Sequence, residues 1–311
     1  MNSWPTDLIP SALRASVAGR QPDSGVAHPI DGDRWLVRLP VQVDEYLDRW
    51  NLTPDGTPLA GENALVLPVR RDTGELAALK LSWPHHEAQF EHLALRLWAG
   101  GGAVTLLAAD PTPQVLLLER LDPTRPLTGV SIFEACEVIG GLFGALGRLA
   151  TPQAPALADH LSPWESPSVT PQVPQRLVQQ AAASEPDLLS SAPQTSLVHT
   201  DLHDANVLAP LDPERGEWLA IDPKVVAGEW AYAVAPIVWN RPDDLARAHD
   251  LRVHARLRAD IVGDVAGLDP DRVRAWTFVR LVRNAVDTAC HAPGNSEFLT
   301  RMITLAKAFA D

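Results

Sequence analysis

Apolar and polar positions follow two different periods along this chain. Short apolar runs bounded by turn residues come first, and they predict β-strands at 64–69, 76–81, 104–108 and 115–118. A turn sequence at 72–75 separates the first two runs and predicts a hairpin. Later in the chain the apolar residues recur at helical spacing. A β-rich part followed by a larger helical part predicts an α+β fold rather than alternating β–α–β units.

The helical part begins after the last predicted strand. Its predicted helices lie at 131–148, 171–190, 232–239, 243–262, 270–290 and 296–310. The proline-rich span 152–174 is expected to be a loop or to contain short helices.

Helices are also expected in the β-rich part. One should run from Pro84 to Trp98, because proline suits the first helical turn and apolar residues repeat behind it. Three glycines at 100–102 are expected to stop this helix rather than to bind phosphate. A shorter helix is expected at 43–50. Residues 1 to about 40 are expected to be irregular, because five prolines interrupt them.

Length and composition narrow the class of protein. A chain of 311 residues with 46% hydrophobic residues is large enough for two lobes, each with a core. The net charge of −13 argues against a nucleic-acid partner, and it suits either a cationic substrate or simple solubility. No apolar run is long enough for a membrane span, and no signal peptide is evident. Two cysteines, Cys136 and Cys290, are expected to be reduced, buried thiols in a cytoplasmic protein.

One stretch, LVHTDLHDANVL at 197–208, carries the strongest chemical signal. Asp201 and Asn206 are five residues apart, as in the catalytic loop of protein kinases. Sixteen residues after Asn206, the apolar run WLAI ends in Asp222. Phosphoryl transfer needs a carboxylate to align the attacking hydroxyl, here Asp201, and oxygen ligands for Mg²⁺, here Asn206 and Asp222. The alternative is an Asx-turn followed by an ordinary buried strand.

These motifs resemble those of the aminoglycoside phosphotransferase superfamily, and within it the streptomycin 6-kinase and hydroxyurea phosphotransferase group. The resemblance rests on HTDLHDANVL, on AIDPKVVAGEWAYAVAPIVWN, and on shorter matches at 65–71, 78–80, 94–98 and 116–121, so it covers most of the chain from about Trp50. It implies a protein-kinase-like fold with a small β-rich N-lobe, at 1–118, and a helical C-lobe, at 119–311. It also implies transfer of the γ-phosphoryl group of ATP to a small hydroxylated molecule.

A kinase also needs a lysine for the α- and β-phosphates, on the strand after the first hairpin turn. Lys80 occupies that place, although it could be an ordinary lysine of an edge strand. The lysine needs a carboxylate from the next helix, and Glu87 and Glu91 share a helix face. The resemblance favours Glu91, with Glu87 as the alternative.

The remaining nucleotide contacts are less well defined by the sequence. Gly61 is the candidate for the loop that covers the phosphates, since glycine allows close approach of the backbone. The full glycine pattern of protein kinases is absent, which argues against a eukaryotic-type protein kinase. If the family geometry holds, main-chain atoms of Glu119 and Leu121 contact the adenine, and their side chains matter little.

Three residues depart from the pattern of the family. Thr200 and Ala205 stand where glycine is usual, so the loop must adopt ordinary backbone conformations there. Ala233 stands where an Asp is usual, and that Asp is expected to cap or tie its segment. Two histidines, His199 and His203, flank Asp201; we expect structural roles for them rather than zinc binding.

The acceptor molecule is not readable from a motif. Asp204, Glu229 and Asp287 could meet a guanidinium or ammonium group, or could each be a surface acid. The resemblance makes streptomycin the specific hypothesis. The alternatives are a kinase of a cellular sugar, amino sugar or amino alcohol, and a non-catalytic nucleotide-binding protein.

Overall fold

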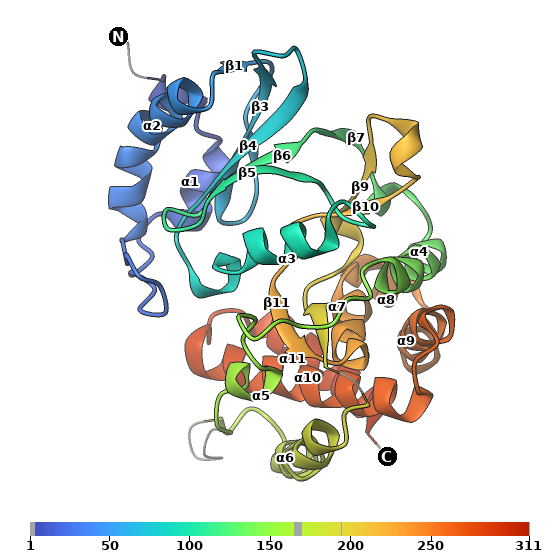
Figure 1. Ribbon diagram of the computed structural model, residues 1–311. Coiled ribbons are helices and arrows are strands. Elements are labelled where there is room, and N and C mark those ends of the chain that lie inside the picture. The colour runs from blue at the N-terminus through green and yellow to red at the C-terminus, as the bar shows by residue number, and fades with distance from the viewer. Residues whose placement is uncertain (1–3, 165–169, 194, 311) are drawn as a thin grey trace. The chain divides into compact units, whose positions relative to one another are not determined.

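The structure is a computed structural model that describes residues 4–164, 170–193 and 195–310 (Figure 1). The chain divides into two compact units. The first comprises Met1–Pro123 and Pro210–Glu217, and the second comprises Thr124–Ala209 and Trp218–Asp311. The first unit contains a large β-sheet and the second is mainly helical, so the predicted α+β fold is confirmed.

An antiparallel sheet forms the centre of the first unit. Its strand order is β1-β3-β4-β6-β5, and β2 pairs with β3. The strands are β1 (Leu52–Pro54), β2 (Leu59–Ala60), β3 (Ala64–Arg71), β4 (Leu76–Ser82), β5 (Leu106–Asp110) and β6 (Val115–Glu119). The predicted hairpin joins β3 to β4, and its turn places Gly74 at a φ of +86°. Strand β4 therefore lies inside the sheet, with neighbours on both edges.

The expectation of an irregular N-terminus is wrong. Helix α1 (Ser11–Val17) follows a short 3-10 turn, η1 (Thr6–Leu8), and helix α2 spans Gly32–Arg49. Pro40 lies inside α2, and Asp31 caps that helix by accepting a hydrogen bond from the N–H of Arg34. The apolar face of α2 explains why one proline does not end it: its buried residues, at 35, 36, 39, 43 and 46, recur at helical spacing and join the core under the sheet.

Glycine is required where α1 meets α2. A Cβ atom on Gly32 would lie 1.9 Å from the carbonyl oxygen of Val17 at the end of α1. The two helices therefore approach closely at that point, and both pack against the sheet (Figure 1). A larger residue at position 32 would separate α1 from α2.

The helix after β4 begins later than expected. Pro84 does not start it; a 3-10 turn, η2 (His86–Ala88), comes first, and α3 spans Glu91–Trp98. Ala99 ends α3 in the left-handed conformation, with a φ of 48°, and Gly100 continues with a φ of +79°. The glycines at 100–102 thus follow the end of the helix, as predicted.

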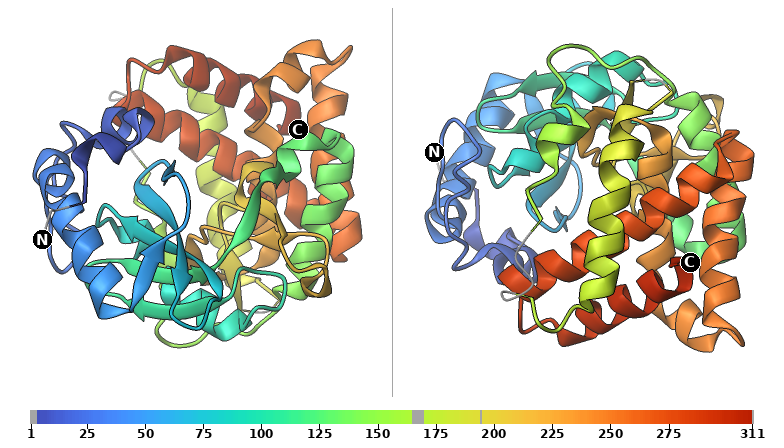
Figure 2. Two further views of the ribbon diagram at one scale, coloured as in Figure 1. Left: turned by 90° about the horizontal axis from the view of Figure 1, so that it is seen from above. Right: turned by 90° about the horizontal axis from the view of Figure 1, so that it is seen from below.

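Helices α9 and α10 anchor the second unit. Helix α10 packs against α6, α9 and α11 (Figure 2), and α9 packs against α4. The helices are α4 (Ile132–Ala145), α5 (Leu157–His160), α6 (Gln175–Ser190), α7 (Ala235–Trp239), α8 (Pro242–Arg247), α9 (Leu251–Ala266), α10 (Pro270–His291) and α11 (Ser296–Phe309).

Two boundaries in the second unit differ from the predictions. The helix expected at 243–262 is two helices, α8 and α9, because the side chain of Asp250 caps a new start by accepting from the N–H of Val253. The segment expected as a helix at 232–239 begins as a 3-10 helix, η6 (Trp230–Val234), before α7. The proline-rich span contains the short helix α5, and its residues 165–169 lie outside the described residues.

Five short strands lie close in sequence to the candidate catalytic residues. Strands β7 (Leu121–Pro126), β9 (Val207–Pro210) and β10 (Leu219–Ala220) form one small sheet, in the order β10-β9-β7. Strands β8 (Ser196–His199) and β11 (Val225–Gly228) form an antiparallel pair. The apolar run that ends at Asp222 was interpreted as a strand, and β10 lies in it. The other four strands were not predicted individually, because each has only four to six residues.

The two cysteines differ in their burial. Cys136 is buried, and burial raises the pKa of its thiol to about 12. Cys290 is only half-buried, contrary to expectation, and the two cysteines are not joined in a disulfide. Across the described ranges, the longest and most apolar helices still fall short of what a bilayer crossing requires.

Candidate active site

Lys80 and Glu91 form a buried ion pair in the first unit. Lys80 lies on β4 between Val66 of β3 and Leu116 of β6, so it is not on an edge strand. Its Nζ lies 2.7 Å from both carboxylate oxygens of Glu91. Both residues are buried, with 6% and 2% of their surface exposed. Glu91 is the first residue of α3, where a carboxylate is also favoured by the helix dipole.

The burial of Lys80 and Glu91 makes each charge depend on the other. An isolated buried charge is costly, and each partner here offsets the other. The Glu91 carboxylate holds the ammonium group in one place on an interior strand. A lysine fixed in this way is suited to binding a phosphate group that arrives at the sheet.

Gly61 lies in the turn between β2 and β3. Its N–H donates to the carbonyl of Ala64 at 2.8 Å. A Cβ atom added to Gly61 would meet its nearest neighbour, the same carbonyl oxygen, at 3.5 Å, which is an ordinary contact. The local conformation of the loop therefore does not itself require glycine at position 61.

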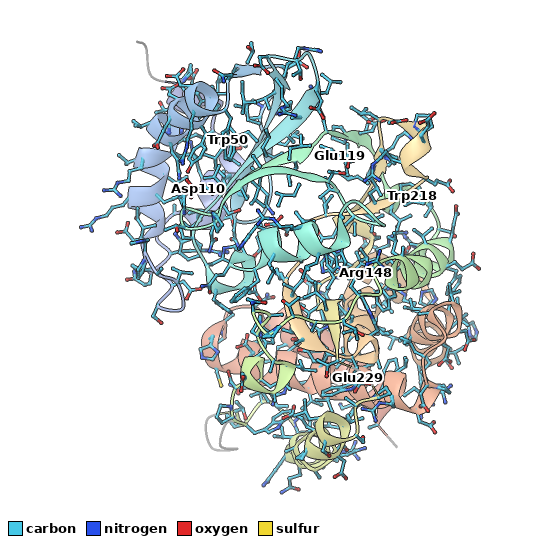
Figure 3. All side chains as sticks on the ribbon, in the orientation of Figure 1. Trp50, Asp110, Glu119, Arg148, Trp218 and Glu229 are labelled. Atoms are coloured by element: carbon cyan, nitrogen blue, oxygen red, sulfur yellow. The ribbon has the colours of Figure 1, made fainter. Side chains whose placement is uncertain are left out.

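The side chain of Glu119 holds a network together at the end of β6. Its carboxylate accepts from both Nε and Nη2 of Arg215, at 3.2 and 2.9 Å, and from the N–H of Thr105 at 2.8 Å. Figure 3 labels Glu119 in the first unit. Arg215 also donates to the carbonyls of Gly100 and Ala103. The Glu119 side chain therefore has a structural role, because it joins β6 to the segment around Arg215.

The main-chain N–H of Glu119 is also used within the unit. It donates to the carbonyl of Thr105 at 2.9 Å, so this N–H already has a hydrogen-bond acceptor within the protein. Leu121 begins β7 and is 7% exposed. For adenine recognition, this leaves the main-chain carbonyl of Glu119 and the main chain of Leu121 as the groups to test.

In the second unit, His199 fixes the start of the catalytic loop. It ends β8, is completely buried, and its Nε2 lies 3.1 Å from the carbonyl oxygen of Ile221. Its Nδ1 accepts from the N–H of Asp201 at 3.2 Å. These two bonds require a neutral ring that carries its proton on Nε2. Burial lowers the pKa of His199 to about 4, so the ring stays neutral at physiological pH.

The β9–β10 pairing brings Asn206 and Asp222 together. Asn206 directly precedes β9, and Asp222 follows β10 by two residues. The strands are antiparallel, with Val207 opposite Ala220, so the start of one meets the end of the other. The N–H of Ile221 donates to the carbonyl of Asn206 at 2.9 Å and extends this pairing.

Both side chains present oxygen atoms at this place. The Asn206 amide nitrogen donates to the main-chain carbonyl of Asp201 at 2.9 Å, which leaves Oδ1 as the atom that can bind a cation. Asp222 adopts the left-handed conformation, with a φ of 53°. Such a conformation is unfavourable for most residues and is frequent at functional sites. An amide oxygen and a carboxylate are the donors that Mg²⁺ prefers, so the donor set fits this ion.

Asp201 follows β8 and interacts with a lysine for which the sequence indicated no role. The Nζ of Lys224 lies 3.0 Å from Oδ2 of Asp201, and about a quarter of each side chain is exposed. Lys224 lies two residues after Asp222 and directly before β11. The signal in the sequence was the motif IDPK, in which the lysine follows Asp222 by two residues. When β11 pairs with β8, Lys224 lies beside the catalytic loop.

Arg280 connects the catalytic loop to neighbouring elements of the second unit. Arg280 of α10 donates to the main-chain carbonyls of Thr200 and Tyr232, at 2.9 and 3.1 Å. Its guanidinium also lies 4.3 Å from the centre of the Tyr232 ring. The loop is thereby connected to the long helix α10 and to η6. Ala233 of η6 is buried, and Arg280 holds the main chain of the neighbouring Tyr232.

Asp204 is a structural anchor and neither a surface acid nor a group free to meet a substrate. It is 2% exposed and accepts from Nε of Arg241 at 2.5 Å. The same guanidinium donates to the carbonyls of Val130 and Leu127, at 2.7 and 2.9 Å. Arg241 therefore connects the middle of the catalytic loop to the residues that directly precede α4.

Glu229 is likewise buried and paired. It binds the guanidinium of Arg272 and accepts from the indole nitrogen of Trp276 at 2.5 Å; Figure 3 labels it in the second unit. Asp287 differs, because it is exposed and lies 2.9 Å from His291 on the same helix. Of the three acids considered for the acceptor, Asp204 and Glu229 are thus engaged in buried ion pairs.

His203 has a local structural role. Its Nδ1 accepts from the N–H of Ala205 at 3.3 Å and so caps the 3-10 turn η4 (Asp204–Asn206). His199 uses both ring nitrogens on the main chain. Throughout the part of the chain that the structure describes, no cluster of three or more His, Cys, Asp or Glu residues has the arrangement of a metal site.

Comparison with known proteins places the chain among kinases. Residues 49–290 match the family model described as aminoglycoside/hydroxyurea antibiotic resistance kinase. A streptomycin 6-kinase of Streptomyces glaucescens is 37% identical over 289 residues, which cover 89% of this chain and 90% of the relative. A hydroxyurea phosphotransferase of Kitasatospora aureofaciens is 37% identical over 265 residues, which cover 82% and 74%.

Solved structures share the fold at low sequence identity. A choline/ethanolamine kinase family protein from Mesorhizobium loti aligns with a TM-score of 0.55 and 16% identity, covering 86% of this chain and 94% of that chain. This likeness supports the protein-kinase-like fold that was expected from the sequence.

Proposed function

The chain belongs to the aminoglycoside/hydroxyurea antibiotic resistance kinase family, and we propose that it transfers the γ-phosphoryl group of ATP to a hydroxyl group of streptomycin or a similar aminoglycoside. The observation that carries the proposal is the gathering of Asp201, Asn206 and Asp222 by two short strand pairs, β8–β11 and β9–β10. These are the carboxylate and the two oxygen ligands that phosphoryl transfer requires.

In the proposed reaction, Asp201 aligns the acceptor. Its carboxylate accepts the hydrogen bond of the acceptor hydroxyl. The hydroxyl oxygen forms a bond to the γ-phosphorus while the bond from that phosphorus to the β–γ bridging oxygen breaks. The proton passes to Asp201, and ADP leaves. Positioning and charge neutralisation supply most of the acceleration in reactions of this kind.

In this proposal the nucleotide is bound by residues of the first unit. Lys80, fixed by Glu91, binds the α- and β-phosphates. Main-chain atoms of Glu119 and Leu121 bind the adenine, and the turn at Gly61 approaches the phosphates. Asn206 and Asp222 would hold Mg²⁺, which when bound neutralises phosphate charge.

Streptomycin is the first acceptor to test. The Streptomyces glaucescens relative is named for phosphorylation of streptomycin, and alignment with it covers nine tenths of both chains. Streptomycin carries guanidinium groups, and this chain carries a net charge of −13, which attracts cations. Hydroxyurea is the second candidate acceptor, because the relative from Kitasatospora aureofaciens, which is also 37% identical, is named hydroxyurea phosphotransferase.

A panel of acceptors tests the proposal. ATP consumption is measured with purified protein and MgATP in the presence of streptomycin, hydroxyurea, amino sugars or amino alcohols. The proposal expects turnover with streptomycin that is lost in Asp201→Ala. Turnover with an amino sugar but not with streptomycin would leave a kinase of a cellular metabolite. No turnover with any acceptor would contradict the proposal.

A further inference from the structure

Lys224 is fixed beside Asp201 by its own main chain. Strands β8 and β11 pair with Val225 opposite His199. The pairing continues one residue further, where the carbonyl of Lys224 accepts from the N–H and the hydroxyl of Thr200, at 2.8 and 2.9 Å. This places the side chain of Lys224 next to the residue that follows Thr200, and its Nζ reaches Oδ2 of Asp201 at 3.0 Å.

Lysine is a rare residue in this protein. Of the 26 cationic residues, only Lys80, Lys224 and Lys307 are lysines, and the others are arginines. Positive charge is therefore supplied by arginine almost everywhere. Two of the three lysines contact a carboxylate of the candidate active site, Glu91 or Asp201. An ammonium group is a compact point charge, whereas a guanidinium is a wide planar fork, so lysine provides a small cation at these two positions.

We propose that Lys224 is a positioning residue for phosphoryl transfer, which holds Oδ2 of Asp201 so that Oδ1 accepts the hydrogen bond of the acceptor hydroxyl. This inference rests on the proposed function of Asp201. The contact is charge-assisted, and about three quarters of each side chain is shielded from solvent, so it restricts the rotation of the carboxylate. A carboxylate held by one oxygen offers the other in a defined direction.

The proposal concerns alignment and adds no chemical step. The γ-phosphoryl group still moves from the bridging oxygen of ATP to the acceptor oxygen, and the hydroxyl proton still moves to Asp201. Lys224 keeps its own proton throughout. Its removal should therefore lower kcat while ATP binding is preserved.

A set of variants tests the role of Lys224. Lys224→Met should lower kcat by about 10²-fold, the cost of a misplaced reacting group, with little change in KM for ATP. Lys224→Arg keeps the charge and should retain more activity than Lys224→Met, though less than the parent. Lys307→Met removes the same charge from an exposed position on α11 and should leave kcat within about twofold.

A double-mutant cycle separates positioning from a general structural effect. If Lys224 acts through Asp201, the kcat losses of Lys224→Met and Asp201→Asn will be strongly non-additive. Losses that simply multiply would overturn the proposal, as would a kcat of Lys224→Met near that of the parent. The main-chain bonds to Thr200 remain in every variant, and thermal melting checks the fold; Lys224→Gln serves if Lys224→Met does not fold.

The outcome also distinguishes this inference from the proposed function. A parent protein that transfers phosphate to no acceptor removes the proposed function, and this inference with it. A parent protein that is active, with Lys224→Met equally active, removes the role of Lys224 alone.

Discussion

Thr200 binds the main-chain carbonyl of Lys224 with both its N–H and its hydroxyl, at 2.8 and 2.9 Å. The catalytic loop is thus tied directly to the segment that follows Asp222. Glycine, the residue that the resemblance to the family implies at position 200, could make only the first of these bonds. The departure from the family pattern therefore adds a contact at this point.

The hydroxyl of Thr200 should contribute to stability. Thr200→Val removes the hydroxyl and keeps the branched shape, so it should lower the free energy of unfolding by about 1 kcal/mol, the usual net value of one hydrogen bond. Thr200→Ser keeps the hydroxyl and should lose less. Urea unfolding of the three proteins measures the difference, and equal midpoints and slopes for parent and Thr200→Val would contradict it.

The ion pair between Lys80 and Glu91 should be important for both folding and nucleotide binding. Glu91→Gln leaves the buried ammonium without its carboxylate, which should lower the free energy of unfolding by about 3–5 kcal/mol and raise KM for ATP. Glu87→Gln is the matched control on the preceding 3-10 turn and should have a much smaller effect. Larger losses in Glu87→Gln than in Glu91→Gln would assign the role to Glu87.

Stability should fall in mild acid because of His199. The pKa of this buried ring falls from 6.5 to about 4 on folding, so between these values the unfolded chain binds a proton that the folded chain does not. Its contribution is therefore fully present above pH 6.5 and is lost as the pH falls toward 4, by about 3 kcal/mol. Urea unfolding at several pH values across this range measures how steeply the free energy of unfolding changes with pH. The slope should decrease in His199→Gln, and an unchanged slope would exclude His199 as its source.

Arg241 should be needed for a rigid catalytic loop. Arg241→Met leaves the buried Asp204 carboxylate and two main-chain carbonyls without their donor, so it should lower the free energy of unfolding by about 3–5 kcal/mol. Arg247→Met is a suitable control, because Arg247 is exposed and pairs with Asp244 on the same helix. Equal melting temperatures for Arg241→Met and the parent would show that the loop has other support.

Local sequence patterns predicted the elements that local forces determine. The β3–β4 hairpin has its turn glycine and two short apolar strands, and α3 ends at a run of glycines. Only the last part of helix α2 was predicted, at 43–50, because Pro40 was given more weight than the apolar repeat around it. The repeat from Trp35 to Tyr46 was readable, and burial of that face against the sheet offsets one lost hydrogen bond.

The candidate site was predictable in part for a similar reason. Asp201, Asn206 and Asp222 are signalled by spacing and by apolar neighbours. The partners of Asp204, Glu229 and Glu119 are 37, 43 and 96 residues away in the chain. Such distant ion pairs leave no local pattern. Lys224 lay within the motif, but only the β8–β11 register shows that it reaches Asp201.

The central claim is that Asp201 aligns a hydroxyl of an aminoglycoside for phosphoryl transfer from ATP. The most direct test is mass spectrometry of streptomycin after incubation with MgATP and either the parent protein or Asp201→Ala. We predict that the parent adds one phosphoryl group and that Asp201→Ala is slower by about 10²–10⁴-fold while still binding ATP. Phosphorylation of streptomycin at the same rate by both proteins would contradict the role of Asp201, and no phosphorylation by the parent would contradict the proposed acceptor.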